Sequence, residues 1–209
     1  MDKKLIRANF RKKNYNFSYD YKIFKDIKKI LKINKKLKNI LLYIPLKKEV
    51  NLLKFKRKLS KYQLFSPIML EDGKLKIVKL RYPLVQKKFK VKESISKRAI
   101  NKIDLAIIPS LGVDCNLRRI GFGKGYYDKT FTNYNNLLII FIQNKQSLVD
   151  FKICSKQDLQ ADIYITSNKF YVRKESNNEC RRNYIASYCS NFRINHRLLH
   201  CKKNKRCTF

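Results

Sequence analysis

The feature that most constrains this chain is a short apolar segment followed by a glycine-rich loop. The segment 105–108 contains β-branched residues and lies between Asp104 and Pro109, which predicts a buried strand. Glycines then occupy every second position before a segment that predicts the start of a helix: Gly121, Gly123 and Gly125. A strand, a glycine-rich loop and a helix in this order are typical of an α/β sheet.

The glycine-rich loop is a candidate phosphate-binding loop. Backbone without Cβ can turn its N–H groups toward an anion, and a following helix N-terminus adds unpaired donors. Arg118, Arg119 and Lys124 add positive charge, and Asp128 is placed to hold a Mg²⁺ ion that accompanies phosphates. The spacing matches neither the P-loop nor the dinucleotide-binding fingerprint, so a glycine-rich connection without a ligand remains an alternative.

The chain is strongly basic. Its 209 residues include 50 Lys and Arg against 15 Asp and Glu, which gives a formal net charge of +35. Such a charge attracts polyanions: nucleic acid, an acidic membrane surface, ATP or a polyglutamylated cofactor. Lys, Asn and Ile are all abundant, so a compositional bias of the genome is the alternative explanation of the lysines.

The sequence contains neither an apolar run of membrane-spanning length nor the apolar core of a signal peptide. We therefore expect a cytoplasmic protein without a membrane partner. In that reducing compartment the cysteines are expected to be free thiols, with Cys115 acting as a small apolar side chain.

Helical and strand patterns alternate along the chain, which predicts an α/β domain. Helices are expected at 3–13, 18–37 and 50–59, with Ser18 as a candidate N-cap. Strands are expected at 40–44, 63–70, 75–80, 105–108, 137–142 and 163–166. Asp72-Gly73 predicts the turn of a hairpin between the second and third of these strands.

The segment 119–128, RIGFGKGYYD, resembles the signature of the 5-formyltetrahydrofolate cyclo-ligase family, the methenyltetrahydrofolate synthetases. An apolar strand ending in Pro109 and then Asp114 precede it, as in that family, and the resemblance extends over residues 3 to 170. It implies a three-layer α/β/α fold with a mainly parallel sheet, similar to that of the CoA transferases. It also implies a ligase that cyclises 5-formyltetrahydrofolate to 5,10-methenyltetrahydrofolate with ATP and Mg²⁺.

The resemblance implies a set of site residues. For ATP they are Lys3, Arg7, Arg119, Ile120, Gly121, Phe122, Gly123, Lys124, Gly125, Tyr126 and Tyr127. For the folate they are Ile44, Glu49, Phe122, Gly123, Lys124, Gly125 and Tyr126. Arg119 and Lys124 are the implied catalytic residues, and Asp128 and Asp158 the implied metal ligands.

Structural alternatives remain open for several of these residues. Lys3 and Arg7, four apart, also fit the solvated face of a basic helix. Glu49 also fits a cap of the helix that follows it, and one of Tyr126 and Tyr127 is expected to belong to the core.

Four positions depart from the family pattern: Lys90 replaces a Gly, Ser94 replaces a Pro, Leu117 replaces a Gly and Lys129 replaces an Arg. We expect Asn116 to supply the left-handed turn beside Leu117, since Asn tolerates positive φ. These departures keep open a decayed homologue with little turnover.

Residues 173–209 have no counterpart in the family pattern, so we expect a domain at 1–172 and a disordered basic tail at 173–209. The rival function is a basic RNA-binding or ribosome-associated protein. No RNP, KH or zinc-knuckle pattern supports it, so no specific nucleic acid is expected. A monomer that binds a reduced folate, with or without a polyglutamate tail, is the expected state.

Overall fold

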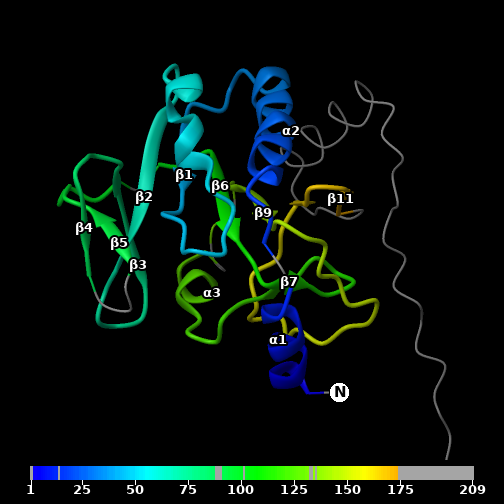
Figure 1. The fold of residues 1–209 in the computed structure, drawn as a ribbon. Coiled ribbons are helices and arrows are strands. Elements are labelled where there is room, and N and C mark those ends of the chain that lie inside the picture. The colour runs from blue at the N-terminus through cyan, green and yellow to red at the C-terminus, as the bar shows by residue number, and fades with distance from the viewer. Residues whose placement is uncertain are drawn as a thin grey trace, which may run out of the picture.

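The computed structural model (Figure 1) describes residues 2–173 except 14, 88–90, 101, 132, 133 and 135. Its helices are α1 (Lys3–Arg11), α2 (Tyr19–Ile33), the 3₁₀ helix η1 (Leu52–Leu59) and α3 (Tyr126–Phe131). Its strands are β1 (Asn39–Leu42), β2 (Gln63–Met69), β3 (Leu75–Lys79), β4 (Leu84–Gln86), β5 (Lys92–Ser94), β6 (Leu105–Pro109), β7 (Gly112–Val113), β8 (Arg119–Ile120), β9 (Leu138–Ile142), β10 (Ile163–Ile165) and β11 (Phe170–Val172). Of the expected tail, only Arg173 is among these residues.

The central sheet has seven strands in the order β11-β10-β9-β6-β1-β2-β3. The neighbours from β10 to β2 pair in parallel. The two edge strands, β3 and β11, pair antiparallel with their neighbours. The expected α/β fold with a mainly parallel sheet is confirmed, and β11 is an edge strand that the sequence pattern did not predict.

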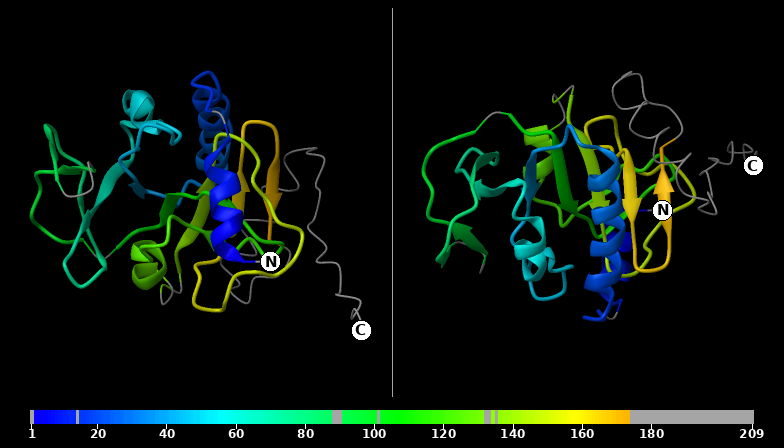
Figure 2. Two further views of the ribbon diagram at one scale, coloured as in Figure 1. Left: turned by 60° about the horizontal axis from the view of Figure 1, so that its bottom comes forward. Right: turned by 90° about the horizontal axis from the view of Figure 1, so that it is seen from above.

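Both faces of the sheet are covered (Figure 2). Along β6, Leu105 and Ile107 pack in the cluster that contains the apolar face of α2 and residues of η1. Ala106 and Ile108 alternate with them and pack in a second cluster, which contains Phe131 of α3. All residues of β6 are buried, as expected for a strand covered on both faces.

Helix α1 lies apart from the main layers and packs on the β7–β8 hairpin. Ile6 forms a small cluster with Ile120 and Val149. The approach is close at Gly112, where an added Cβ would lie 2.3 Å from the Phe10 ring and 2.5 Å from the Ser147 carbonyl oxygen. Glycine at this position is therefore needed for α1 to pack against the hairpin.

Several local expectations are corrected. The helix expected at 50–59 is 3₁₀ and begins at Leu52, with the Asn51 side chain accepting from the Leu53 N–H. The Ser18 side chain makes no cap hydrogen bond at the start of α2. The β4–β5 hairpin was not predicted, whereas the turn at Gly73 (φ +79°) is confirmed. None of the helices within the described residues has the length and apolar character needed to cross a bilayer.

Candidate active site

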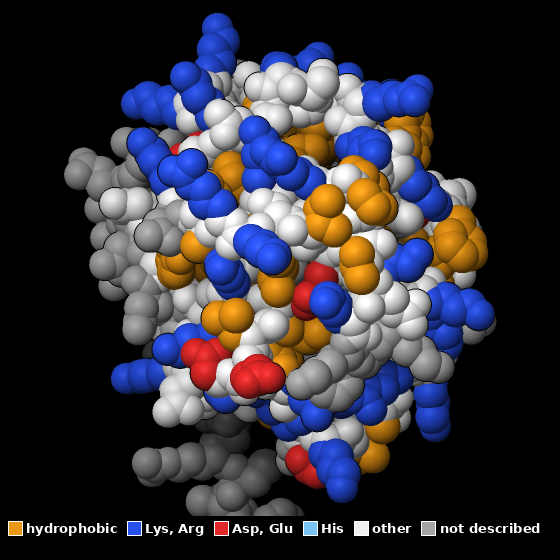
Figure 3. All heavy atoms as spheres, turned by 90° about the vertical axis from the view of Figure 1, so that its left-hand side faces the viewer, with side chains coloured by type: hydrophobic (Ala, Val, Ile, Leu, Met, Phe, Trp, Pro, Cys, Tyr) orange, Lys and Arg blue, Asp and Glu red, His pale blue; other side chains and the backbone are white. Residues whose placement is uncertain are grey.

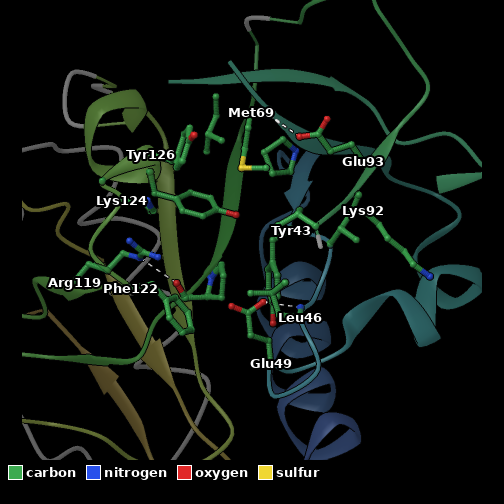
Figure 4. A pocket seen from close by; sticks show the side chains of 17 residues that line it. Tyr43, Leu46, Glu49, Met69, Lys92, Glu93, Arg119, Phe122, Lys124 and Tyr126 are labelled. Carbon is green, nitrogen blue, oxygen red and sulfur yellow. Dashed lines mark hydrogen bonds between the residues drawn. The ribbon is translucent and has the colours of Figure 1, made fainter. Parts of the chain in front are cut away.

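The carboxyl ends of β1 and β6 and the glycine-rich loop enclose a first cavity of about 140 Å³, here called the apolar pocket (Figure 4). Parallel strands place their carboxyl ends at one edge of the sheet, where α/β proteins bind ligands. Glu49 and Leu46 lie on one side of this pocket, and Arg119, Phe122 and Lys124 lie on the other. The lining residues are Tyr43, Ile44, Leu46, Glu49, Pro67, Met69, Leu75, Val91, Lys92, Glu93, Pro109, Arg119, Phe122, Lys124, Gly125, Tyr126 and Tyr127.

Glu49 is a carboxylate placed within this largely apolar lining. Its Oε2 accepts a hydrogen bond of 2.9 Å from the Leu46 N–H. Burial raises the pKa of Glu49 to about 7, although the Leu46 N–H and the positive charge of Arg119 act in the opposite direction. The alternative that Glu49 caps the next helix is wrong, because Asn51 takes that position. Glu49 is instead free to meet a donor within the pocket.

Glu93 is a second carboxylate of the apolar pocket. It is only 6% exposed, and its Oε1 accepts from the Met69 N–H at 2.9 Å. This bond joins β5 to the end of β2. This contact depends on the tertiary fold, which brings two separate segments together.

Arg119 lies at the boundary between the pocket and the core, and is 5% exposed. Its Nε donates to the Pro109 carbonyl oxygen at 3.0 Å, and its Nη1 lies 3.4 Å from Asp128 Oδ2. The guanidinium also lies over the Tyr127 ring, 4.9 Å from the centroid. A Cβ at Gly121 would come within 2.3 Å of Nη1, so glycine there leaves the space that this guanidinium occupies.

A second cavity of about 470 Å³, the polar pocket, adjoins the first at Gly125. Gly123 and Gly125 have φ of +106° and +71°, in the region that glycine adopts without strain. The lining combines cationic, anionic and backbone groups: Arg7, Gly121, Gly123, Gly125, Asp128, Lys129, Ser155, Gln157 and Asp158.

Helix α1 reaches the polar pocket from the start of the chain. Arg7 Nε donates to the Gly121 carbonyl oxygen at 3.0 Å. Lys3 Nζ lies 2.7 Å from Asp158 Oδ1. Partial burial acts to raise the pKa of Asp158, but the Lys3 ammonium and the donors of Ser155 outweigh it and lower that pKa. Both side chains are partly buried and engaged with the loop or with Asp158, which does not fit the alternative of a solvated helix face.

Asp128 and Asp158, the two implied metal ligands, both line the polar pocket. Asp128 Oδ1 accepts from the Leu159 N–H at 3.0 Å. Among the described residues there is no group of three or more His, Cys, Asp or Glu side chains with metal-ligand geometry. Two carboxylates nevertheless suit Mg²⁺, which prefers oxygen ligands and takes the rest from phosphate and water.

Other predicted site residues divide between pocket and core. Ile44 lines the apolar pocket. Tyr126 and Tyr127 both line it and both pack against the core, so neither is a purely structural residue. The Ile120 side chain is fully buried beside Ile6, so only its backbone is available to a ligand.

The left-handed turn before the loop is formed by Leu117 itself, at φ +57°, so the expectation for Asn116 is wrong. Asp114 Oδ1 accepts from the N–H groups of both Asn116 and Arg118, which closes this turn. Leu117 is 1% exposed and packs in the core, and this burial offsets the strain of its backbone. Lys90 and its neighbours lie outside the described residues, while Ser94 accepts from the Arg81 N–H.

Sequence reasoning missed several lining residues. Tyr43, Met69 and Lys92 of the apolar pocket come from three separate segments, and Lys129, Ser155 and Gln157 complete the polar pocket. The position of Tyr43 directly after the first strand was the one available signal. The expected apolar character of Cys115 agrees with its burial.

Comparisons with known proteins agree with this architecture. The NMR structure of the Aquifex aeolicus 5,10-methenyltetrahydrofolate synthetase matches with a TM-score of 0.71 and 22% identity, over 84% of this chain and 95% of that chain. A 5,10-methenyltetrahydrofolate synthetase structure from Mycoplasma pneumoniae matches with a TM-score of 0.61 and 25% identity, over 79% of this chain and 98% of that one. A search of curated proteins gave no match. The 5-formyltetrahydrofolate cyclo-ligase family model matches residues 3–159, and the chain belongs to this family.

Proposed function

We propose that this protein cyclises 5-formyltetrahydrofolate to 5,10-methenyltetrahydrofolate with ATP and Mg²⁺, releasing ADP and phosphate. The observation that carries the proposal is the pair of adjoining pockets. One pocket is largely apolar and contains the carboxylate of Glu49, and the other is polar and charged. They share Gly125 of the glycine-rich loop. A folate and the triphosphate of ATP differ in polarity in the same way.

The apolar pocket is the proposed folate site. The amino group and ring N–H of a pterin form a donor pair that a carboxylate can accept with both oxygens. Glu49 is the proposed acceptor, and Ile44 and Tyr126 are proposed ring contacts. Phe122, which is 41% exposed, lies at the mouth and would cover the bound ligand.

The polar pocket is the proposed ATP site. Arg7, Lys3, Lys124 and the backbone of the glycine-rich loop would neutralise and hold the phosphates. Asp128 and Asp158 would hold the Mg²⁺ ion, since both carboxylates line this pocket. Bound there, Mg²⁺ would supply positive charge that offsets the charge of the phosphate oxygens.

The reaction needs two transfers in sequence. A formamide oxygen leaves poorly, so it first attacks the γ-phosphorus of ATP and releases ADP. N10 then attacks the activated formyl carbon, loses its proton, and the C–O bond breaks to release phosphate. The residues at the boundary of the pockets, Arg119 and Lys124, would hold the formyl oxygen in line with the γ-phosphate.

The test is the appearance of the methenyl chromophore when the purified full-length protein meets 5-formyltetrahydrofolate, with Mg-ATP and without it. ATP-dependent formation of the chromophore, with one ADP released for each product, is expected. A folded protein that gives no product would contradict the proposal and favour a decayed homologue.

The same proposal extends to the natural substrate and its setting. A polyglutamate tail carries several carboxylates, and the surplus of lysines would attract it. The proposed setting is a monomeric protein of the cytoplasm. Equal affinities for mono- and polyglutamylated substrate at low salt would contradict this extension.

A further inference from the structure

A third cavity, the lysine groove, lies between α2 and η1. It has a volume of about 320 Å³ and shares no lining residue with the apolar or the polar pocket. Its lining residues are Tyr21, Phe24, Lys25, Lys28, Lys29, Lys32 and Lys58. Lys25, Lys28 or Lys29, and Lys32 follow one another at intervals of three or four residues along one side of α2, while Lys58 comes from η1.

The lysines of this region lie against exposed aromatic rings. Lys25 and Lys58 both point at the Tyr21 ring, with Nζ 5.2 Å and 5.3 Å from its centroid. The neighbouring lysines of η1 repeat the arrangement, because Lys54 lies 5.1 Å from the Phe17 ring and Lys56 lies 3.4 Å from the Tyr82 ring. The three residues Phe17, Tyr21 and Tyr82 are 66%, 46% and 45% exposed.

The groove is lined by cations without an acidic residue, although α2 carries two acids. Asp20 is buried and pairs with Lys54, and Asp26 pairs with Lys29. Neither acid lines the groove. Two ammonium groups at one ring repel each other, and a bound polyanion would relieve that repulsion.

Charge alone does not distinguish the groove from the rest of the surface. Figure 3 shows Lys and Arg side chains spread over the face that carries β3 and β4, with few acidic groups among them. What distinguishes the groove is the combination of an open cavity, cations from two elements and the exposed Tyr21 ring, with the exposed Phe17 and Tyr82 rings against the neighbouring lysines of η1. Because a nucleotide offers both a base and a phosphate, each ring with its ammonium matches one nucleotide.

The geometry points to a binding site for single-stranded nucleic acid on the face formed by α2 and η1, apart from the folate chemistry. Bases would stack on the exposed rings while phosphates meet the lysines. A membrane surface fits less well, because the apolar face of α2 is buried against the sheet and cannot insert into lipid. An acidic peptide would meet the lysines but would leave the rings without a stacking partner.

The test measures fluorescence anisotropy of a labelled oligouridylate of about 12 nucleotides with the full chain. In the groove variant, K25Q, K28Q, K32Q and K58Q are combined, since Gln keeps helix propensity and all four side chains are exposed. The control variant combines K79Q, K87Q, K97Q and K102Q, which remove equal charge from exposed positions that line none of the three cavities. Both variants contain the same basic tail.

We expect the groove variant to lose at least about tenfold in affinity and the control variant less than about threefold. The slope of log affinity against log salt should become shallower by about 3 in the groove variant, at about 0.7 for each phosphate contact. Its cyclo-ligase turnover should equal that of the unmodified protein. Equal losses in the two variants would overturn the proposal and leave the charge as a compositional bias.

The rings are tested separately. Tyr21→Ala should weaken oligouridylate binding about 5- to 140-fold, the range for loss of one stacked base, whereas Tyr21→Phe should retain it. Binding of an RNA duplex, whose bases are not free to stack, should change little in Tyr21→Ala or Tyr21→Phe. Equal binding by Tyr21→Ala and Tyr21→Phe would overturn the stacking arrangement. A groove variant that loses affinity for phosphatidylserine vesicles or hexaglutamate but keeps its affinity for RNA would overturn the proposal.

Discussion

Replacement of Glu49 by Gln should stabilise the fold at neutral and alkaline pH. Burial raises the pKa of Glu49 from 4.5 to about 7, so between these values the folded state keeps a proton that the unfolded state releases. The free energy of unfolding therefore falls as pH rises from about 4.5 to about 7. Above about 7 the folded state bears the whole free-energy cost of an ionised Glu49 carboxylate in its buried position. The difference between the two pKa values corresponds to about 3 kcal/mol. Because Glu49 keeps part of its surface in water, we expect about 2 kcal/mol.

The measurement is urea denaturation of both proteins at pH 5 and pH 8.5. Glu49→Gln should match the unmodified protein within about 0.5 kcal/mol at pH 5 and exceed it by about 2 kcal/mol at pH 8.5. Glu71→Gln, at an exposed position in the β2–β3 turn, controls for the loss of one negative charge. A stability difference that is the same at both pH values would refute the assigned burial cost of Glu49.

The same carboxylate predicts the pH dependence of catalysis. If the ionised form binds the pterin, kcat/KM for the folate should rise about tenfold per pH unit below about pH 7 and level off above it. Glu49→Gln should be slower throughout and should lose this part of the pH profile. An unchanged profile in the variant would show that another group controls it.

Four further substitutions test the site and the turn before its loop. Gly121→Ala should displace the Arg119 guanidinium and lower kcat at least about 100-fold. Gly125→Ala, with nothing within 4 Å of its Cβ, should leave Arg119 in place and cost about 1–2 kcal/mol of stability because of its positive φ. Measuring kcat and the urea midpoint of both variants separates the two effects. Lys3→Met should raise KM for ATP about fivefold or more without changing KM for the folate. Steady-state kinetics with equal rises in both would contradict its proposed role, through its pairing with Asp158, at the ATP site. Leu117→Gly should destabilise the protein by about 2 kcal/mol, because the loss of about 3 kcal/mol of stabilisation from the buried Leu side chain exceeds the roughly 1 kcal/mol of backbone strain that is relieved. A higher urea midpoint in the variant would show that the strain outweighs the burial.

The sequence predicted the parts of the fold whose cause is local. The run at 105–108 is apolar without alternation because β6 is covered on both faces, and that composition is visible in the chain. The turn at Gly73 is likewise set by its own residues. The antiparallel edge strand β11 carries only three residues, too few for a periodic signal.

The site was predicted only where a motif brought its residues together. Glycines and charges within 119–128 are adjacent in sequence, so their shared loop was predictable. The contacts of Glu93 with Met69 and of Lys3 with Asp158 join distant segments, and only the strand order and the packing of α1 bring them together. The conformation of Leu117 was missed because the burial of its side chain in the core outweighs the usual preference of Leu for negative φ.

The docking of α1 has a consequence for biosynthesis. Within the described chain the helix is made before the segments on which it packs, and Ile6 contacts Ile120 and Val149 only after most of that chain has been made. A helix of nine residues is marginal in water by itself, so it gains its stability late. The nascent protein can therefore assemble its central sheet before α1 docks, and the polar pocket would be the last region to mature. Nucleotide bound in the proposed site would then hold α1 to the loop and to the segment around Asp158.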